Sequence, residues 1–249
     1  MKKLTVIAGV AVTLLISSLT SLAQTQSRED VLKDIKAKRA ELLALEKTFL
    51  SPSEEDQAQY AEFLRTPNTG LVRLLPREKF DTPTYTDAER TIVTRGGGAY
   101  YSFTRLTHEY GISTDIELAG NQFTVGFAGL DHGFMTNLGD VPLENVSAET
   151  PTAAVFSTYK PPREEPLVRI EQRRFGLGSE LEGVQVKRTL PVKLNSTYML
   201  RSLNYGECDV LVVIRVVRID SDGSVTLLWK LLKKYETPDV KRPEPAVAG

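Results

Sequence analysis

The chain has 249 residues, of which 41% are hydrophobic and 25% charged, a composition typical of a globular protein with one large domain or two small ones. Its formal net charge of −1 gives no basic excess, which argues against a nucleic acid as partner. A single cysteine, Cys208, excludes an intramolecular disulfide, so a non-covalent core must hold the fold together.

Residues 1–23 have the pattern of a secretory signal peptide. Two lysines precede an apolar run over 4–19, and Ser21-Leu22-Ala23 fits a small-x-small cleavage site. We therefore predict an exported, periplasmic or extracellular protein that begins near Gln24 and has no stable membrane insertion after cleavage. The lysine-led signal is more typical of bacteria than of eukaryotes. The alternative is an uncleaved anchor helix, but the run is shorter than the roughly 20 residues that span a bilayer.

The sequence pattern over residues 24–70 predicts an α-helical hairpin. Ser27 opens a capping box, and a helical pattern follows over 27–50. A second capping box, Ser51-Pro52-Ser53-Glu54, predicts a helix over 52–65. One face of the first helix carries a heptad-like seam: Val31, Ile35, Lys38, Leu42, Leu45 and Phe49. We expect the seam to pack on the second helix or on a sheet, and the alternative is a homo-oligomer formed through 27–50.

The sequence pattern over residues 71–235 predicts a mainly antiparallel β domain. Apolar or alternating runs bounded by turn-forming residues indicate its strands: 71–75, 91–94, 99–107, 115–118, 123–127, 153–156, 183–187, 190–192 and 197–203. One short helix is expected near 163–175, between a proline pair and a glycine-rich stop. Its apolar residues Leu167, Ile170 and Phe175 are expected to face inward.

The clearest β signal is the pair of runs over 209–219 and 225–232. β-branched residues dominate the first run, and Ser221-Asp222-Gly223 forms the turn between the two. The first run is apolar on both sides near its start, which predicts a central strand, and Trp229 is expected in the core. Residues 236–249, with three prolines and mixed charge, predict a disordered tail. The predicted fold class is therefore α+β, with the helical hairpin packed on a mainly antiparallel sheet, a sandwich or half-barrel.

A triple glycine and the aromatic residues after it make 95–134 the candidate functional region. No helix and no lysine in register follow the glycines, which therefore indicate a turn or bulge rather than a phosphate-binding loop. In a regular strand over 99–107, alternate side chains share one face. Aromatic stacking and bidentate guanidinium contacts suit an extended, partly anionic or sugar-like ligand. The candidate ligand-binding residues are Arg95, Tyr101, Phe103, Arg105, Asp131 and His132.

The predicted function is that of an exported bacterial cell-envelope protein that binds a ligand or an envelope protein without a cofactor. The alternative is a metal-assisted hydrolase in which His108, Asp131 and His132 hold a divalent metal. No HxH, HExxH or HxxEH spacing supports it, and Ser102 lacks the nucleophile elbow of a hydrolase triad. A buried, inert thiol is expected at Cys208, with an intermolecular disulfide or a nucleophile as alternatives.

Overall fold

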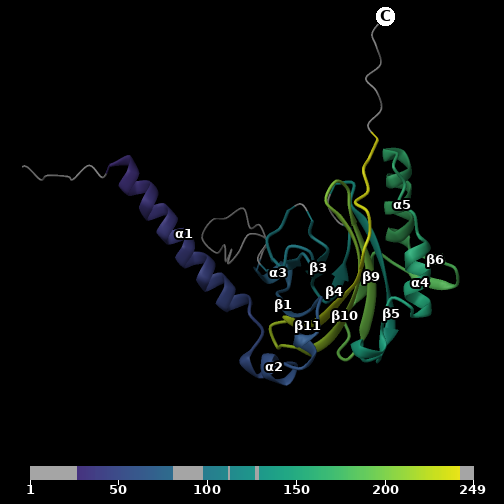
Figure 1. Cartoon of the computed structure of the whole chain (residues 1–249), viewed down its shortest axis with the longest axis horizontal. Coiled ribbons are helices and arrows are strands. Elements are labelled where there is room, and N and C mark those ends of the chain that lie inside the picture. The colour runs from purple at the N-terminus through teal and green to yellow at the C-terminus, as the bar shows by residue number, and fades with distance from the viewer. Residues whose placement is uncertain (1–26, 81–97, 112, 127–128, 242–249) are drawn as a thin grey trace, which may run out of the picture. The chain divides into compact units, whose positions relative to one another are not determined.

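The computed structural model describes residues 27–80, 98–111, 113–126 and 129–241 (Figure 1). The signal-peptide pattern, the strand predicted over 91–94 and Arg95 lie outside the described residues. Within the described part of the chain, no helix combines the length and the apolar character needed to cross a membrane.

Helix α1 (Arg28–Leu50) confirms the helix predicted over 27–50, and it spans the boundary between two units of the chain, residues 1–42 and 43–249. The backbone N–H of its first turn donates to Ser27 Oγ at 3.1 Å, as the capping box predicts. Leu50 is its buried side chain. The apolar members of the predicted seam are exposed: Val31, Ile35, Leu42, Leu45 and Phe49.

The second helix is shorter than predicted. Helix α2 covers Glu54–Gln59, and Ser53 Oγ caps it by accepting a backbone N–H of the first turn at 3.1 Å. The backbone leaves the helical conformation at Tyr60, with φ −102° and ψ 14°. The prediction of a helix over 52–65 capped by Ser51 is wrong, because Ser51 Oγ instead donates to a carbonyl of α1 at 2.6 Å. Three further short helices are α3 (Arg77–Phe80), η1 (Phe63–Arg65) and η3 (Leu143–Asn145).

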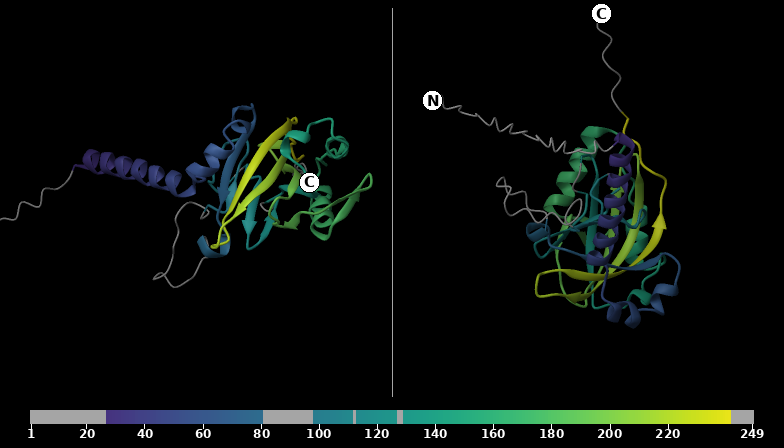
Figure 2. Two further views of the ribbon diagram at one scale, coloured as in Figure 1. Left: turned by 90° about the horizontal axis from the view of Figure 1, so that it is seen from below. Right: turned by 90° about the vertical axis from the view of Figure 1, so that its left-hand side faces the viewer.

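The described residues form a five-stranded and a four-stranded antiparallel sheet. In order across the first sheet lie β1 (Thr69–Leu74), β11 (Val225–Lys234), β10 (Cys208–Ile219), β9 (Thr197–Asn204) and β5 (His132–Gly139). In order across the second lie β2 (Tyr100–Tyr101), β3 (Ile116–Ala119), β4 (Gln122–Thr124) and β8 (Thr189–Pro191). A separate ribbon pairs β6 (Ser179–Leu181) with β7 (Val184–Val186). β10 is the central strand, as predicted, and Figure 2 shows the yellow β11 beside the blue β1.

The five-stranded sheet is buried on both faces. One face shares a core with the four-stranded sheet, including Ile116, Phe123, Val212 and Trp229. The other face packs under α4 (Pro151–Thr158) and α5 (Glu165–Leu177), with Phe156, Phe175 and Val213 in the core (Figure 1). A strand covered on both faces reads as a continuous apolar run, which explains the composition of β10. The structure thus confirms the α+β class with mainly antiparallel sheets.

The aromatic strand predicted over 99–107 is cut short. β2 has two residues, and the chain then turns back so that Ser102 bridges Thr107. The turn is fixed because the Phe103 N–H donates to the buried carboxylate of Asp115 at 2.8 Å instead of to a neighbouring strand. The prediction that alternate side chains of this stretch share one strand face is therefore wrong.

The strand predicted over 153–156 is helix α4. Pro151 stands in its first turn, and the buried residues Ala153 and Phe156 are three positions apart, a helical spacing. Conversely, the segment from His132, where no strand was predicted, is strand β5. It pairs with β9, which is distant in sequence.

Helix α5 confirms the helix predicted near 163–175. Phe175 is buried as predicted, whereas Leu167 and Ile170 are 46% and 49% exposed, so their expected inward orientation is wrong. Val168 is buried instead, because it lies seven positions before Phe175, about two helical turns, which places both on one face of the helix.

Residues 236–241 of the expected disordered tail make backbone contacts with the rest of the chain. The Gly206 N–H donates to the Pro238 carbonyl at 2.9 Å, and the Lys241 N–H donates to the Arg163 carbonyl at 2.7 Å. This part of the expected tail is therefore ordered, and the remainder lies outside the described residues.

Candidate functional site

The aromatic residues of the candidate region belong to the core. The ring centroid of Tyr101 lies 5.3 Å from that of Phe103 and 5.2 Å from that of His108. The Phe103 centroid lies 5.6 Å from that of Trp229, an edge-to-face arrangement typical of packed aromatic side chains. Tyr101 and Phe103 are 7% and 2% exposed and pack in the core, and their role in ligand binding stays a prediction. The predicted burial of Trp229 is confirmed.

The two histidines have different surroundings. His108 Nε2 donates to the Arg73 carbonyl at 2.8 Å. His132 is fully buried, stacks on Phe175, and donates from Nε2 to the Tyr159 hydroxyl at 2.9 Å. Burial lowers the pKa of both imidazoles, that of His132 to about 4, so both rings are neutral at pH 7.

The metal site predicted at His108, Asp131 and His132 is not formed. The Asp131 carboxylate accepts the Tyr205 N–H at 3.1 Å, and burial raises the pKa of this carboxyl to about 6. Among the residues that the structure describes, no group of three or more His, Cys, Asp or Glu side chains could hold a metal ion. His132 is fully buried and Asp131 is half-buried, and their role in ligand binding stays a prediction.

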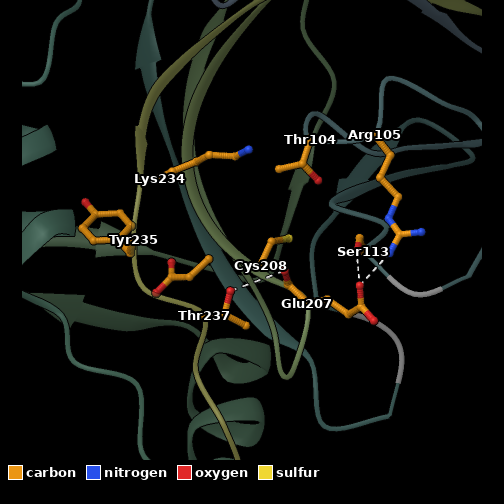
Figure 3. Close-up of a pocket in the computed structure, with 9 residues that line it drawn as sticks. Thr104, Arg105, Ser113, Glu207, Cys208, Lys234, Tyr235 and Thr237 are labelled. Carbon is orange, nitrogen blue, oxygen red and sulfur yellow. Dashed lines mark hydrogen bonds and ion pairs between the residues drawn. The ribbon is translucent and has the colours of Figure 1, made fainter.

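Arg105, by contrast, lines a cavity of about 270 Å³ (Figure 3). Four segments meet there: the turn after β2, the approach to β3, the start of β10 and the end of β11. The lining residues are Thr104, Arg105, Ser113, Glu207, Cys208, Asp209, Lys234, Tyr235 and Thr237. Strand pairing sets one wall, because Val210 lies opposite Lys234. Gly206, with φ 77°, makes the turn that leads Glu207 into β10.

Glu207 ties the separate segments of this cavity together. Its carboxylate accepts Arg105 Nη2 at 2.6 Å and Ser113 Oγ at 3.0 Å. The Arg105 side chain remains 56% exposed, so the ion pair is open to solvent on one side. Lys234 reaches across the cavity toward Thr104 (Figure 3) and has no ion pair or side-chain hydrogen bond with any other described residue.

Cys208 lies on the inner side of the cavity, above a buried polar cluster. Its Sγ is 3.3 Å from Asn204 Nδ2 and 3.8 Å from a carboxylate oxygen of Asp115. Burial raises the pKa of Asp115 to about 6, and burial together with this carboxylate raises the pKa of Cys208 to about 12. The thiol is therefore protonated at neutral pH, as expected of an inert buried cysteine rather than a nucleophile.

A buried ion pair supports the opposite wall. Arg201 donates to both carboxylate oxygens of Asp209, at 2.9 and 2.8 Å, and these side chains are 2% and 1% exposed. Arg201 Nη1 also donates to the carbonyls of Phe156 and Tyr159 at 2.6 and 2.7 Å. The Tyr235 ring lies 3.9 Å from the guanidinium carbon, a cation–π contact. This network positions Asp209 and Tyr235 in the cavity wall and joins α4 to the sheet.

Of the predicted ligand-binding residues, Arg105 lines this cavity, and the residues around it were not predicted. Arg105 and Glu207 are 102 positions apart, so no local pattern connects them. One signal was present for the wall behind the cavity: Arg201 is the one charged residue of strand β9, and Asp209 opens the next strand. A charge within an apolar strand requires a partner, because an unpaired buried charge is costly.

No protein-family model, no curated protein and no solved structure matches the chain.

Proposed function

We propose that this chain is an exported bacterial protein that binds a small carboxylate-bearing ligand in the cavity lined by Arg105. The observation that carries the proposal is Lys234, whose ammonium group has no partner among the described residues. It lies across the cavity from the ion pair of Arg105 and Glu207 (Figure 3). A free cation next to a half-open ion pair is suited to receive an anionic group.

The volume of the cavity limits the size of the ligand. Pockets that hold drug-sized molecules measure roughly 300–1,000 Å³, so about 270 Å³ suits a molecule the size of an amino acid or a monosaccharide. This favours a small ligand over the extended one expected from the aromatic stretch. Lys234 and Arg105 supply cationic donors for a carboxylate, and Glu207 supplies an acceptor for a ligand hydroxyl or ammonium. The ligand class is therefore a small hydroxy- or amino-carboxylate.

The groups at the cavity support binding rather than covalent catalysis. The Cys208 thiol has a pKa raised to about 12, so it supplies almost no thiolate at neutral pH. The Asp115 carboxyl, with a pKa raised to about 6, is fully buried beneath it and accepts hydrogen bonds from Phe103 N–H and Asn204 Nδ2.

The test is calorimetry with a panel of sugar acids, amino acids and short hydroxy acids, compared with their uncharged amides. We expect one carboxylate to bind and Lys234→Met to weaken it by roughly 10- to 100-fold, the usual worth of a hydrogen bond to a charged group. Lys193→Met, which removes the same charge from an exposed site outside the cavity, is the control. Equal affinities for acid and amide, or equal losses in both variants, would overturn the proposal.

Export is supported by the lysine-led apolar run at the start of the chain. The expected product in the periplasm or medium begins near Gln24. N-terminal sequencing of the purified protein checks this, and membrane-bound material that begins at Met1 would instead identify an anchor.

The exposed apolar residues of α1 support self-association through this helix. We expect the double variant Ile35→Lys/Leu42→Lys to lower the mass found by light scattering to that of one chain. Ala40→Lys, on the opposite side of the helix from the seam, is the control. A wild-type protein that is already monomeric at high concentration would exclude the homo-oligomer.

A further inference from the structure

A second cavity, of about 590 Å³, runs along helix α5 and shares no lining residue with the first. Its lining residues are Gly126, Gly129, Arg169, Gln172, Arg173, Gly176, Leu177 and Arg188. The α5 members stand at positions i, i+3, i+4, i+7 and i+8, so they form one face of the helix. Arg188, in the link between β7 and β8, contributes from outside the helix.

Three guanidinium groups line this α5 groove, and none of its lining residues among those described is acidic. Arg169 is engaged, because its Nη1 donates to the Gly129 carbonyl at 2.9 Å and its Nη2 to Glu165 at 3.3 Å. Arg173 is exposed, and its side chain makes no hydrogen bond or ion pair with a described residue. Arg188 has a buried Nε without a hydrogen-bond partner in the described chain. Two of the three cations are thus unpaired.

The unsatisfied Arg188 Nε adds to the case for a ligand, because Arg188 lines the groove and this nitrogen has no acceptor in the described chain. Buried N–H groups are almost always satisfied, so a donor without a partner points to an acceptor supplied from outside the chain. Guanidinium groups bind phosphate oxygens in a bidentate manner, and this preference is stronger than that of lysine. The protein as a whole has a net charge of −1, so the basic groove is a local feature and not the result of overall charge.

We propose that the α5 groove binds a ligand with two linked phosphate groups, one held by Arg173 and the other by Arg188. Arg169, which is hydrogen-bonded to the Gly129 carbonyl, holds that side of the groove in place and adds a positive charge to the ligand site. The volume of about 590 Å³ exceeds what a single phosphate fills, and the open groove admits a larger molecule that carries the diphosphate. This site is separate from the carboxylate cavity, and its test does not depend on the function proposed there.

The experiment titrates the full-length mature protein with pyrophosphate and with inorganic phosphate at constant ionic strength, followed by calorimetry. We expect pyrophosphate to bind more tightly than phosphate. Arg173→Gln and Arg188→Gln should each weaken pyrophosphate by roughly 10- to 100-fold, as expected for loss of charge-assisted hydrogen bonds. Arg65→Gln removes an exposed arginine of η1 outside the groove and should change nothing. Lys234→Met should also leave pyrophosphate affinity unchanged.

The proposal would be overturned by no binding of pyrophosphate at 10 mM, by equal affinity for both probes, or by an equal loss in the Arg65→Gln control. Because Arg173 is exposed, its variant is expected to keep the wild-type unfolding midpoint, so a loss of binding there reports on the ligand contact. A loss in Arg188→Gln alone, with Arg173→Gln unaffected, would also refute the two-point attachment.

Discussion

The replacement Arg201→Met tests the buried network behind the carboxylate cavity. It leaves the Asp209 carboxylate, 1% exposed, without a counter-charge. It also removes the donor that satisfies the carbonyls of Phe156 and Tyr159. Breaking a buried pair from one side costs about 3–5 kcal/mol, because the remaining charge stays buried and unpaired. This is a large part of the roughly 5–15 kcal/mol that stabilises a domain, so the variant should fold but only marginally.

The double variant Arg201→Met/Asp209→Leu separates charge from packing. With both charges gone, no unpaired ion remains, and replacement of buried pairs by apolar residues is often neutral. We expect the double variant to be more stable than Arg201→Met alone, which makes the coupling energy in the double-mutant cycle strongly non-zero. Urea unfolding followed by Trp229 fluorescence and circular dichroism measures each free energy. A loss below about 1 kcal/mol in Arg201→Met, or simple additivity, would refute the reasoning.

Three further outcomes follow from the core. Tyr101→Ala should cost about 3–5 kcal/mol, because the ring is 7% exposed among aromatic neighbours; an unchanged midpoint would place it at the surface, as the sequence suggested. Gly70→Ala should cost about 1–3 kcal/mol, since the new Cβ would stand 2.4 Å from a ring atom of Trp229, and Gly70→Ala/Trp229→Leu should recover part of that loss. Asp115 has a folded-state pKa raised from 3.8 to about 6, so its contribution is complete below about pH 4 and is lost as the pH rises through 6. The stability of wild type relative to Asp115→Asn should therefore fall by about 2 kcal/mol between pH 4 and pH 7 in urea titrations, and a difference independent of pH would contradict the shifted pKa.

Local patterns predicted the elements that local chemistry determines. The hairpin of β10 and β11 follows from a β-branched run and an Asp-Gly turn, and α5 follows from its proline start and glycine stop. The residues 153–156 were misassigned because four adjacent apolar residues carry no period, and packing against the sheet decides between strand and helix. β5 was missed because its pairing with β9 is made by residues more than fifty positions away.

The candidate site shows the same limit more sharply. Aromatic residues such as Tyr101 and Phe103 are common both in binding surfaces and in protein cores. The turn fixed by Asp115 places these two in the core. Arg105 lies at the cavity, where its guanidinium group pairs with Glu207 and its side chain stays 56% exposed. That Glu207 and Lys234 complete this cavity depends on strand order, which no single segment of the sequence contains.

The one thiol of the chain makes opening of the fold chemically visible. At pH 7 a free cysteine, with a pKa of about 8.5, is a few per cent thiolate, whereas a pKa of about 12 leaves roughly 10⁻⁵ in that form. Alkylation of Cys208 in the native state should then proceed on the order of a thousandfold more slowly than in the unfolded chain. The chain has no other cysteine to react. The rate of alkylation therefore reports how often the junction between β9 and β10 opens, without any engineered label.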